Sequence, residues 1–322
     1  MERPSSAGAI FALAALFLIA PSPLLFLVPM AGMLAVTRPQ TVREWIWMAA
    51  TGLLSLTWVL GSGGLADQAV NAMAVLMTGA FIAISAADRR PAFTRAAWSV
   101  LVAAAAIVLW CQVWGIRWTD VELALTRQWW AFCRNLALAA TFAEVSPGGH
   151  AFIERMADAG RPIAQLFPGR LIVSGILGLV VAAVWHQRVT GRPLGRSVDR
   201  LSTFRFTDHL IWLVILGVAV LVIPEVRAFQ AMADRSPVWE VWLYTVSYWA
   251  PVAINLLVVC GALYVARGAA VIRRILRPAP AIALAIIATL FLLPFALAAL
   301  AAIGLADTWM DFRRRIEAHG KA

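Results

Sequence analysis

Amide side chains inside long apolar stretches are the groups in this sequence best placed to bind a solute. Asn71 and Asn255 each interrupt a run of apolar residues, and Gln112 lies near the end of another. A polar group in the lipid interior is costly unless it faces a partner or a cavity. We expect each amide either to hydrogen-bond a neighbouring helix, which is the more common use, or to contact a solute.

An aromatic segment at residues 239–249 precedes the second of these amides and carries Trp242 and Tyr248. Such rings can stack on an aromatic or heterocyclic solute, but more often they mark the boundary between lipid and water. The candidate solute-facing or helix-packing residues are Asn71, Trp242, Tyr248 and Asn255.

A second group of polar residues follows the last apolar stretch. If the helix continues, Asp307 and Asp311 lie one turn apart on one face, and Asp311 can pair with Arg314 or Arg315. Two carboxylates on one face can anchor the helix end at the lipid headgroups, or bind a cation or a partner's arginine. We favour anchoring or docking. The residues of this candidate motif are Gly304, Asp307, Trp309, Asp311 and Arg313.

Patterns typical of catalysis and of metal binding are missing from the sequence. No cysteine or histidine spacing suits a metal, and no nucleophile, P-loop or dinucleotide motif is present. Paired intramembrane acids or histidines, which a membrane enzyme would be expected to have, are absent too. We therefore expect a non-enzymatic protein with no catalytic residue, cofactor or metal. The histidines, His150, His186, His209 and His319, are expected at membrane interfaces.

The composition requires a lipid bilayer as solvent. Hydrophobic residues make up 62% of the chain, charged residues only 14%, and the mean hydropathy is +0.80. A hydrocarbon core of roughly 30 Å needs about 20 apolar residues in a helix, and the runs here lack the alternation of barrel strands. The predicted fold class is therefore all-α, a polytopic bundle of transmembrane helices.

The apolar runs predict about eight spans, with a range of seven to nine. The first run, residues 7–36, is broken by Pro21 and Pro23, so it is one kinked span or two half-spans. Ser174 and Gly178 form a small-x-x-x-small pair suited to helix packing. The remaining runs are 45–60, 66–86, 98–116, 171–185, 210–223, 238–266 and 279–306.

Residues 117–167 differ from these runs because charged residues recur among the apolar ones at helix-like intervals. Segments 121–140 and 150–166 are expected to be amphipathic helices that lie in the membrane interface or fold over the bundle. The chain thus divides into four parts, which we expect to form one folded unit. They are N-terminal transmembrane helices at 1–116, the amphipathic segment at 117–167, C-terminal transmembrane helices at 168–312 and a basic tail at 313–322.

The net charge of +10 comes mainly from arginines in short links between the apolar runs. This distribution matches the excess of basic residues in cytoplasmic loops and provides no basic face for nucleic acid. We expect the links at 88–91, 188–205 and 267–277 in the cytoplasm, while the side of the C-terminal arginines stays open. The chain is thus predicted to be a multi-pass protein of the bacterial cytoplasmic membrane, with the lipid bilayer as a partner.

The motif from Gly304 to Arg313, together with Asn255 and the segment 266–272, resembles the YybS-like family of bacterial membrane proteins, whose function is unknown. The early segment from Pro23 to Pro29 before an arginine-containing turn is similar to that family as well. The family is similar in layout to the S components of energy-coupling-factor vitamin transporters, which implies a solute-binding helical bundle. S components dock their partner through an Ala-x-x-x-Ala pattern in the first helix, where this sequence offers Gly8 and Ala12 at that spacing.

Two functions are compatible with these patterns. The first is a solute-binding or transport-related protein with a cavity among its later helices and residues 239–255 on the cavity wall. The second is a scaffold or accessory subunit that docks other protein subunits through residues 117–167 and the charged tail. An enclosed cavity with inward-facing amide or tryptophan side chains would favour the first function, and packed helices with a broad apolar side would favour the second.

Overall fold

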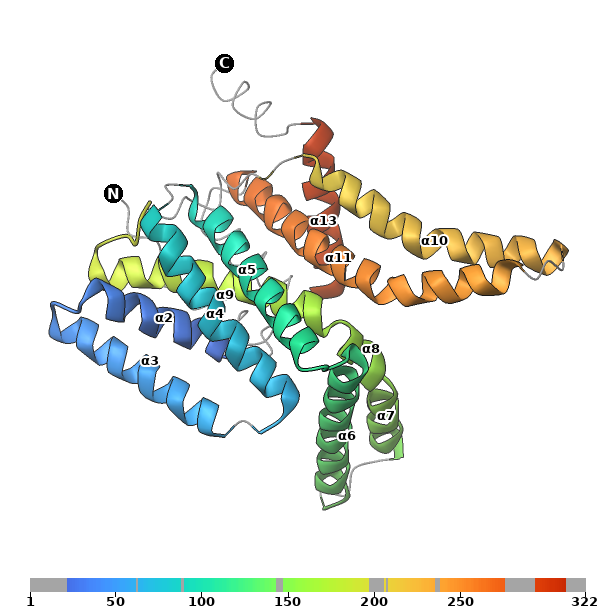
Figure 1. Ribbon diagram of the computed structural model, residues 1–322, viewed down its shortest axis with the longest axis horizontal. Helices are drawn as coiled ribbons and strands as arrows, with labels where there is room; N and C mark the ends of the chain where they lie inside the picture. Colours follow the sequence, from blue (N-terminus) through green and yellow to red (C-terminus); the bar gives the residue numbers. More distant parts are fainter. Residues whose placement is uncertain are drawn as a thin grey trace. The chain divides into compact units, whose positions relative to one another are not determined.

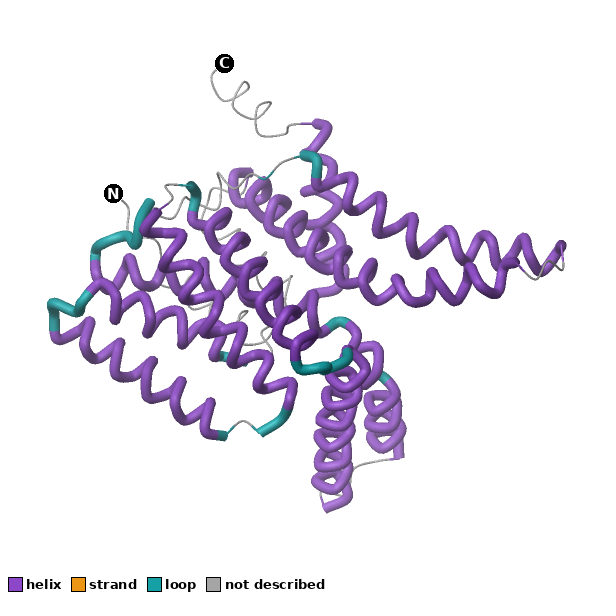
Figure 2. The backbone as a smooth tube through the Cα atoms, in the orientation of Figure 1, coloured by secondary structure: helices purple, strands orange, loops and turns teal. Residues whose placement is uncertain are grey.

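The computed structural model describes residues 22–61, 63–87, 90–142, 147–196, 206, 208–234, 238–275 and 293–310 (Figures 1 and 2). For 139–142, 147–152, 223–234, 238–248, 273–275 and 293–296 the course of the helix is described without the side chains. Helices are the only regular secondary structure in the described ranges, so the predicted all-α fold class is confirmed.

The chain divides into two compact units, Met1–Val198 and Asp199–Ala322, and each is described by itself. This boundary differs from the predicted boundaries at 116 and 167, because the predicted amphipathic segment belongs to the first unit. That all parts form one folded unit stays a prediction.

Five helices form the main bundle of the first unit (Figure 1). Helix α2 packs against α3, α4 and α9, and α5 packs against α4 and α9. The Thr41 hydroxyl oxygen caps the start of α3 by accepting a hydrogen bond from the Glu44 backbone N–H at 3.3 Å. The bounds are α2 Leu24–Thr37, α3 Val42–Leu60, α4 Leu65–Ala87, α5 Ala92–Val113 and α9 Phe167–Thr190.

The core of this bundle is closely packed and rich in methionine. Met33 of α2 and Met77 of α4 are fully buried in it. Gly178 lets α9 touch α2, because a Cβ atom at this position would overlap the Leu25 carbonyl oxygen. Ser174 is fully buried one turn earlier on the same helix. Gly178 of the predicted small-residue pair thus packs two helices together.

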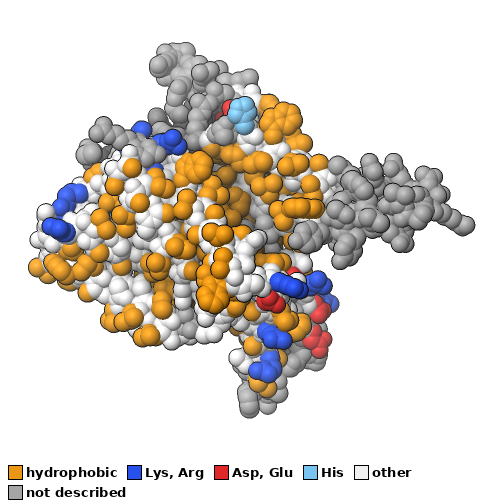
Figure 3. All heavy atoms as spheres, in the orientation of Figure 1, with side chains coloured by type: hydrophobic (Ala, Val, Ile, Leu, Met, Phe, Trp, Pro, Cys, Tyr) orange, Lys and Arg blue, Asp and Glu red, His pale blue; other side chains and the backbone are white. Residues whose placement is uncertain are grey.

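The outer faces of α3 and α5 are strongly apolar. Ile46 and Leu60 of α3 are 62% and 76% exposed, and Leu109 and Val113 of α5 are 65% and 74% exposed. Figure 3 shows apolar side chains spread over the face that is turned toward the viewer. Surfaces of this kind are rare on soluble monomers, whereas lipid tails cover them without the cost that water imposes.

Four described helical segments are long and apolar enough to cross a membrane, as in a membrane protein. The predicted count of about eight spans is not confirmed. The run at 45–60 lies in α3, whose Arg43 and Glu44 lower its hydropathy, and the runs at 7–36 and 279–306 fall partly outside the described residues. The four segments are Leu65–Ala87, Ala92–Val113, Phe167–Thr190 and Trp249–Ile272, and the shorter apolar helices are Leu24–Thr37, Leu210–Val222 and Leu297–Met310.

The predicted amphipathic segments form a helical hairpin within the first unit, in which α6 packs against α7 and α8. Helices are present where they were predicted, but the second is divided into two near Ala159. A position of the hairpin in the membrane interface stays a prediction. The bounds are α6 Trp118–Phe142, α7 Pro147–Asp158 and α8 Gly160–Gln165.

In the second unit, α11 packs against both α10 and α13. Helix α11 continues through Arg267 to its end, so the prediction of a link from residue 267 is wrong for residues 267–275. Arginine and alanine are good helix formers, which allows the helix to continue where the hydropathy falls. Helix α10 likewise continues beyond the predicted end of its apolar run at residue 223. The bounds are α10 Leu210–Asp234, α11 Val238–Ile275 and α13 Leu293–Met310.

Candidate functional site

Arg267 in the second unit is a buried arginine held by two carboxylates. Its side chain is 1% exposed, and it donates from Nε to Asp307 Oδ2 at 2.9 Å and from Nη1 to Asp208 Oδ1 at 2.8 Å. Nη2 also donates to the Asp307 carbonyl oxygen at 3.2 Å, and the guanidinium carbon lies 5.3 Å from the centre of the Phe206 ring. These contacts tie α11 to α13 and to the residues that precede α10.

Two glycines bring α11 and α13 close enough for this ion pair. A Cβ atom at Gly268 would overlap the Leu300 carbonyl oxygen, and one at Gly304 would overlap the Tyr264 carbonyl oxygen. The helix backbones therefore touch, as small residues allow in membrane helices. Because Gly268 follows Arg267 directly and Gly304 precedes Asp307 by three residues, the crossing sets the two charged side chains against each other.

The predicted docking motif is divided by this arrangement. Gly304 lies at the helix crossing, and Asp307 is 1% exposed and paired within the chain. A buried carboxylate needs a partner, and Arg267 of the same chain supplies it. A role of Asp307 together with Asp311 in anchoring or docking stays a prediction. Trp309 is 68% exposed. Asp311 and Arg313 lie outside the described residues.

The predicted solute-facing residues lie in both units. Asn255 is half-buried in α11, and its Nδ2 donates to the Pro251 carbonyl oxygen at 2.7 Å, a bond to the backbone of its own helix. Asn71 is half-buried in α4 of the first unit. Trp242 and Tyr248 lie in the part of α11 whose side chains are not described. That these residues surround one solute stays a prediction.

Arg95 is a second buried arginine, located at the start of α5 in the first unit. Its side chain is 1% exposed, and it donates from Nη1 to the Leu194 carbonyl oxygen at 2.9 Å and from Nη2 to the Arg196 carbonyl oxygen at 2.7 Å. Gly195 between them has a φ of +72°, and a Cβ atom there would lie 2.5 Å from Arg95 Nη1. Arg95 therefore fastens the segment after α9 to α5.

A third polar group joins the start of α3 to the segment after α9. Glu44 is 3% exposed, and its Oε2 accepts hydrogen bonds from the Gln40 backbone N–H at 2.9 Å and from Arg192 Nη2 at 3.2 Å. The Gln40 N–H lowers the pKa of Glu44 below its ordinary value, and the Thr41 hydroxyl and Arg192 act in the same direction. Glu44 is therefore held as a carboxylate in an ion pair that bridges two turns.

His186 of α9 is fully buried beside this group. Its Nε2 lies 3.1 Å from the Thr37 hydroxyl oxygen, and that hydroxyl donates its proton to the Met33 carbonyl oxygen at 3.0 Å. Packing of α2 against α9 covers the ring. That His186 lies at the depth of the membrane interface stays a prediction.

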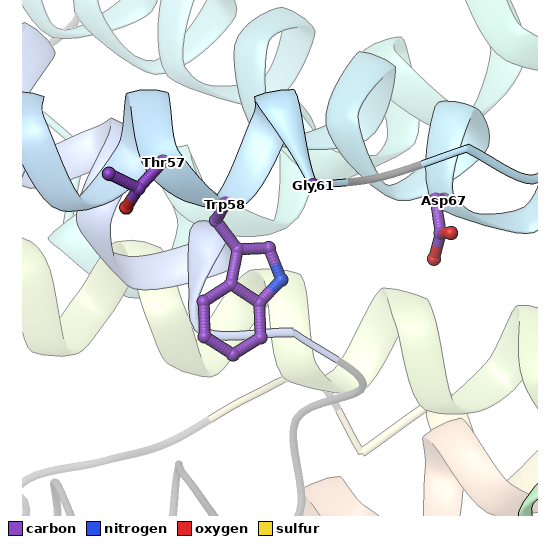
Figure 4. Close-up of a pocket in the computed structure, with 4 residues that line it drawn as sticks. All are labelled: Thr57, Trp58, Gly61 and Asp67. Atoms are coloured by element: carbon purple, nitrogen blue, oxygen red, sulfur yellow. The ribbon is translucent and has the colours of Figure 1, made fainter.

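A surface hollow lies at the other end of α3, in the turn to α4 (Figure 4). Its lining residues are Thr57, Trp58, Gly61 and Asp67, and Figure 4 shows Trp58 and Asp67 directed to the same side of the turn. Asp67 Oδ2 accepts a hydrogen bond from the Gly64 backbone N–H at 3.3 Å, so this carboxylate caps the start of α4. The hollow contains none of the predicted site residues.

Metal-binding geometry is not found within the described ranges, where no three His, Cys, Asp or Glu residues lie close enough to hold an ion. The cysteines are free thiols, with Cys133 and Cys260 buried and Cys111 half-buried. The charged centres of this part of the chain therefore hold helices and turns together through arginine.

The buried arginines were missed at the sequence level because basic residues near apolar runs were assigned to loops. Helical periodicity carries a signal for Arg95, since Ala92, Ala96, Ser99 and Ala103 recur on one buried face that includes it. The same spacing places Arg267 in line with Cys260, Tyr264 and Val271, which are all buried. A single arginine on a stripe of small or apolar residues thus indicates a buried charge rather than a loop.

The chain matches no protein-family model, no curated protein and no solved structure. The resemblance to the YybS-like family stays a prediction based on the residues quoted above.

Proposed function

We propose that this chain is a non-enzymatic, multi-pass protein of the bacterial cytoplasmic membrane that acts as a scaffold or accessory subunit of a larger membrane complex. The observation that carries the proposal is the α6–α8 hairpin, which has a small core of its own and contributes none of its described side chains to the main core of the first unit. A hairpin that does not enlarge the main core is available to bind a partner.

The hairpin is held rigid by contacts between its helices. Cys133 and Ile153 are buried in its core. Trp129 Nε1 donates to the Met156 carbonyl oxygen at 2.6 Å, and Trp130 Nε1 donates to the Ala157 carbonyl oxygen at 3.1 Å. These bonds fix the spacing of α6 and α7 at a point where both tryptophan side chains meet the end of α7.

The same hairpin presents large apolar side chains on its surface. Trp130 and Phe132 are each 53% exposed, and Leu138 is 54% exposed. Exposed Arg127 and Arg134 lie on the same helix. Aromatic side chains and arginines are enriched in protein interfaces, where they supply most of the binding energy. A rigid helix with this surface is suited to a protein partner.

The buried charges support a structural role as well. Arg95 donates to backbone carbonyl oxygens of its own chain, and Arg267 pairs with Asp307 and Asp208. Intramembrane charges usually indicate a functional site, but these contacts are of the kind that fixes helices and turns.

A second candidate function is solute binding, as in the S components of energy-coupling-factor transporters. The half-buried Asn255 and Asn71 favour it, because each lies in a helix apolar enough to span the membrane. The resemblance of the C-terminal segment to the YybS-like family implies the same function. An amide that contacts a solute would be expected to face a cavity rather than lipid.

The test is gentle extraction of the chain from its native membrane, followed by mass spectrometry of the proteins and small molecules that remain bound. Stoichiometric partner subunits that are lost in a Trp130→Ala, Phe132→Ala variant would support docking through α6. The matched control is Trp98→Ala, Trp110→Ala on α5, where the side chains are 51% and 43% exposed. A bound metabolite without partner subunits, lost in Asn255→Ala, would overturn the scaffold in favour of solute binding.

A further inference from the structure

Three separate segments of the first unit place arginines at one end of its bundle. They are the turn between α2 and α3, the turn between α4 and α5, and the segment that follows α9. Their arginines within the described residues are Arg38, Arg43, Arg90, Arg95, Arg188, Arg192 and Arg196. This set is called the basic end below.

Contacts between the segments establish that they meet. Arg192 Nη2 lies 3.2 Å from Glu44 Oε2, which connects the segment after α9 to the start of α3. Arg95 at the start of α5 donates to the Leu194 and Arg196 carbonyl oxygens of the same segment. The three segments therefore meet in space, although they lie far apart in the chain.

The basic end has a large excess of positive charge. Within the described residues 37–44, 90–95 and 186–196, Glu44 is the single acidic residue. It is already shared by the Arg192 guanidinium and the Gln40 backbone N–H. Arg38 and Arg43 are exposed, and the side chain of Arg192 is 41% exposed. These three arginines therefore present positive charge at the surface of this end.

Hydrogen bonds within the chain hold the segment that follows α9, which carries Arg192 and Arg196. Arg95 fixes residues 194–196 through two carbonyl oxygens, and Gly195 adopts a positive φ so that its backbone can approach both the Arg95 guanidinium and the Ser85 carbonyl oxygen. Earlier in the same segment, Thr190 Oγ1 accepts a hydrogen bond from the Arg192 backbone N–H at 3.1 Å. These hydrogen bonds therefore fix the backbone that carries the Arg192 and Arg196 side chains.

The basic end lies where helices that can span a membrane end, which is the position expected for contact with lipid phosphates. Three helices that are long and apolar enough to cross a membrane reach it: α4 with its last residue Ala87, α5 with its first residue Ala92 and α9 with its last residue Thr190. The ends of spanning helices lie at the headgroup layer, where arginine pairs with phosphate oxygens.

We propose that the basic end is a binding surface for anionic phospholipid headgroups of the bilayer, with Arg38 and Arg43 as its exposed contacts and Arg192 and Arg196 held beside them by Glu44 and Arg95. The inference is independent of the scaffold function, because the α6–α8 hairpin contributes none of these residues. Such lipids orient the unit with its basic end at the leaflet that is richer in anionic lipid.

The test measures lipid retention by the full chain in mild detergent. Native mass spectrometry counts the phosphatidylglycerol molecules bound during titration, with phosphatidylcholine of equal chain length as the neutral comparison. We expect phosphatidylglycerol to be retained preferentially, and Arg38→Gln, Arg43→Gln to weaken its binding by about fivefold for each arginine. Arg117→Gln, Arg170→Gln, near the ends of α5 and α9 that are opposite to the basic end, removes the same charge elsewhere and is expected to leave retention unchanged.

Three results would overturn the proposal. Equal retention of the two lipids would show that headgroup charge is not recognised. Equal losses in the basic-end variant and in the Arg117→Gln, Arg170→Gln variant would assign retention to net charge alone. Displacement of the lipid by millimolar inorganic phosphate would indicate a site for a soluble anion. Matching thermal unfolding midpoints for the wild-type protein and the two variants establish that each comparison concerns folded protein.

Discussion

Replacing Asp307 by asparagine is expected to destabilise the second unit by about 3 kcal/mol. Arg267 and Asp307 are each 1% exposed, and the 2.9 Å bond between them is the buried half of the charge network. Removing one member of a buried ion pair costs about 3 to 5 kcal/mol, since the other charge loses its compensation. The lower figure applies because Arg267 keeps the Asp208 carboxylate at 2.8 Å. Such a loss lowers the folded-to-unfolded ratio about a hundredfold.

The assay measures unfolding of the purified full chain in mild detergent. Circular dichroism monitors the loss of helix during heating and during titration with a denaturing detergent. Asp208→Asn is the matched control: Asp208 is 61% exposed, so its loss is expected to cost no more than about 1 kcal/mol. The double variant Arg267→Met, Asp307→Leu is expected to recover most of the stability, because an apolar pair needs no compensation. An unfolding free energy of Asp307→Asn within about 0.5 kcal/mol of the wild-type value would refute the reasoning.

Three further predictions follow from the other contacts. Gly268→Ala is expected to cost about 1 to 3 kcal/mol by forcing α11 away from α13, whereas Gly261→Ala on the same helix, with no atom within 4 Å of the added Cβ, should be neutral in the same unfolding assay. Arg95→Met should release residues 194–196 and speed their cleavage in limited proteolysis. An unchanged cleavage rate would contradict the conclusion that Arg95 holds this segment. The Gln40 N–H lowers the pKa of Glu44 in the folded state. The difference in unfolding free energy between the wild-type protein and Glu44→Gln should therefore be complete above about pH 4.5 and fade as the pH falls through the lower folded-state pKa. A difference that is independent of pH would contradict this.

Much of the fold was predictable because hydropathy and helical propensity are local properties. The runs at 66–86, 98–116 and 171–185 correspond to α4, α5 and α9, with ends that differ by a few residues. The ends differ most where charge was taken as a stop signal, as at Arg95 and Arg267. Both arginines continue the helix because their guanidinium groups find acceptors on other segments, which neighbouring residues cannot reveal.

The candidate site was predicted less well, for a related reason. Asp307 was singled out from its spacing to Asp311, yet its partner Arg267 lies 40 residues away on another helix. That pairing depends on the contact of Gly268 with Gly304, and many small-residue pairs in such a chain never meet. Asn255 was expected to hydrogen-bond a neighbouring helix or to contact a solute, whereas its Nδ2 donates to the Pro251 carbonyl oxygen of its own helix, which only the side-chain geometry reveals.

The sequence by itself determined the solvent and the secondary structure: 62% hydrophobic residues without strand alternation require helices in lipid, since each helix satisfies its own backbone hydrogen bonds. Only the tertiary structure decided which charges are buried and which are presented. Arg95 and Arg267 are covered because small residues let neighbouring backbones approach them, whereas Arg38 and Arg43 stay exposed on a turn. A guanidinium is buried where a crossing supplies its acceptors, and that crossing is a property of the packed helices, which no single stretch of sequence contains.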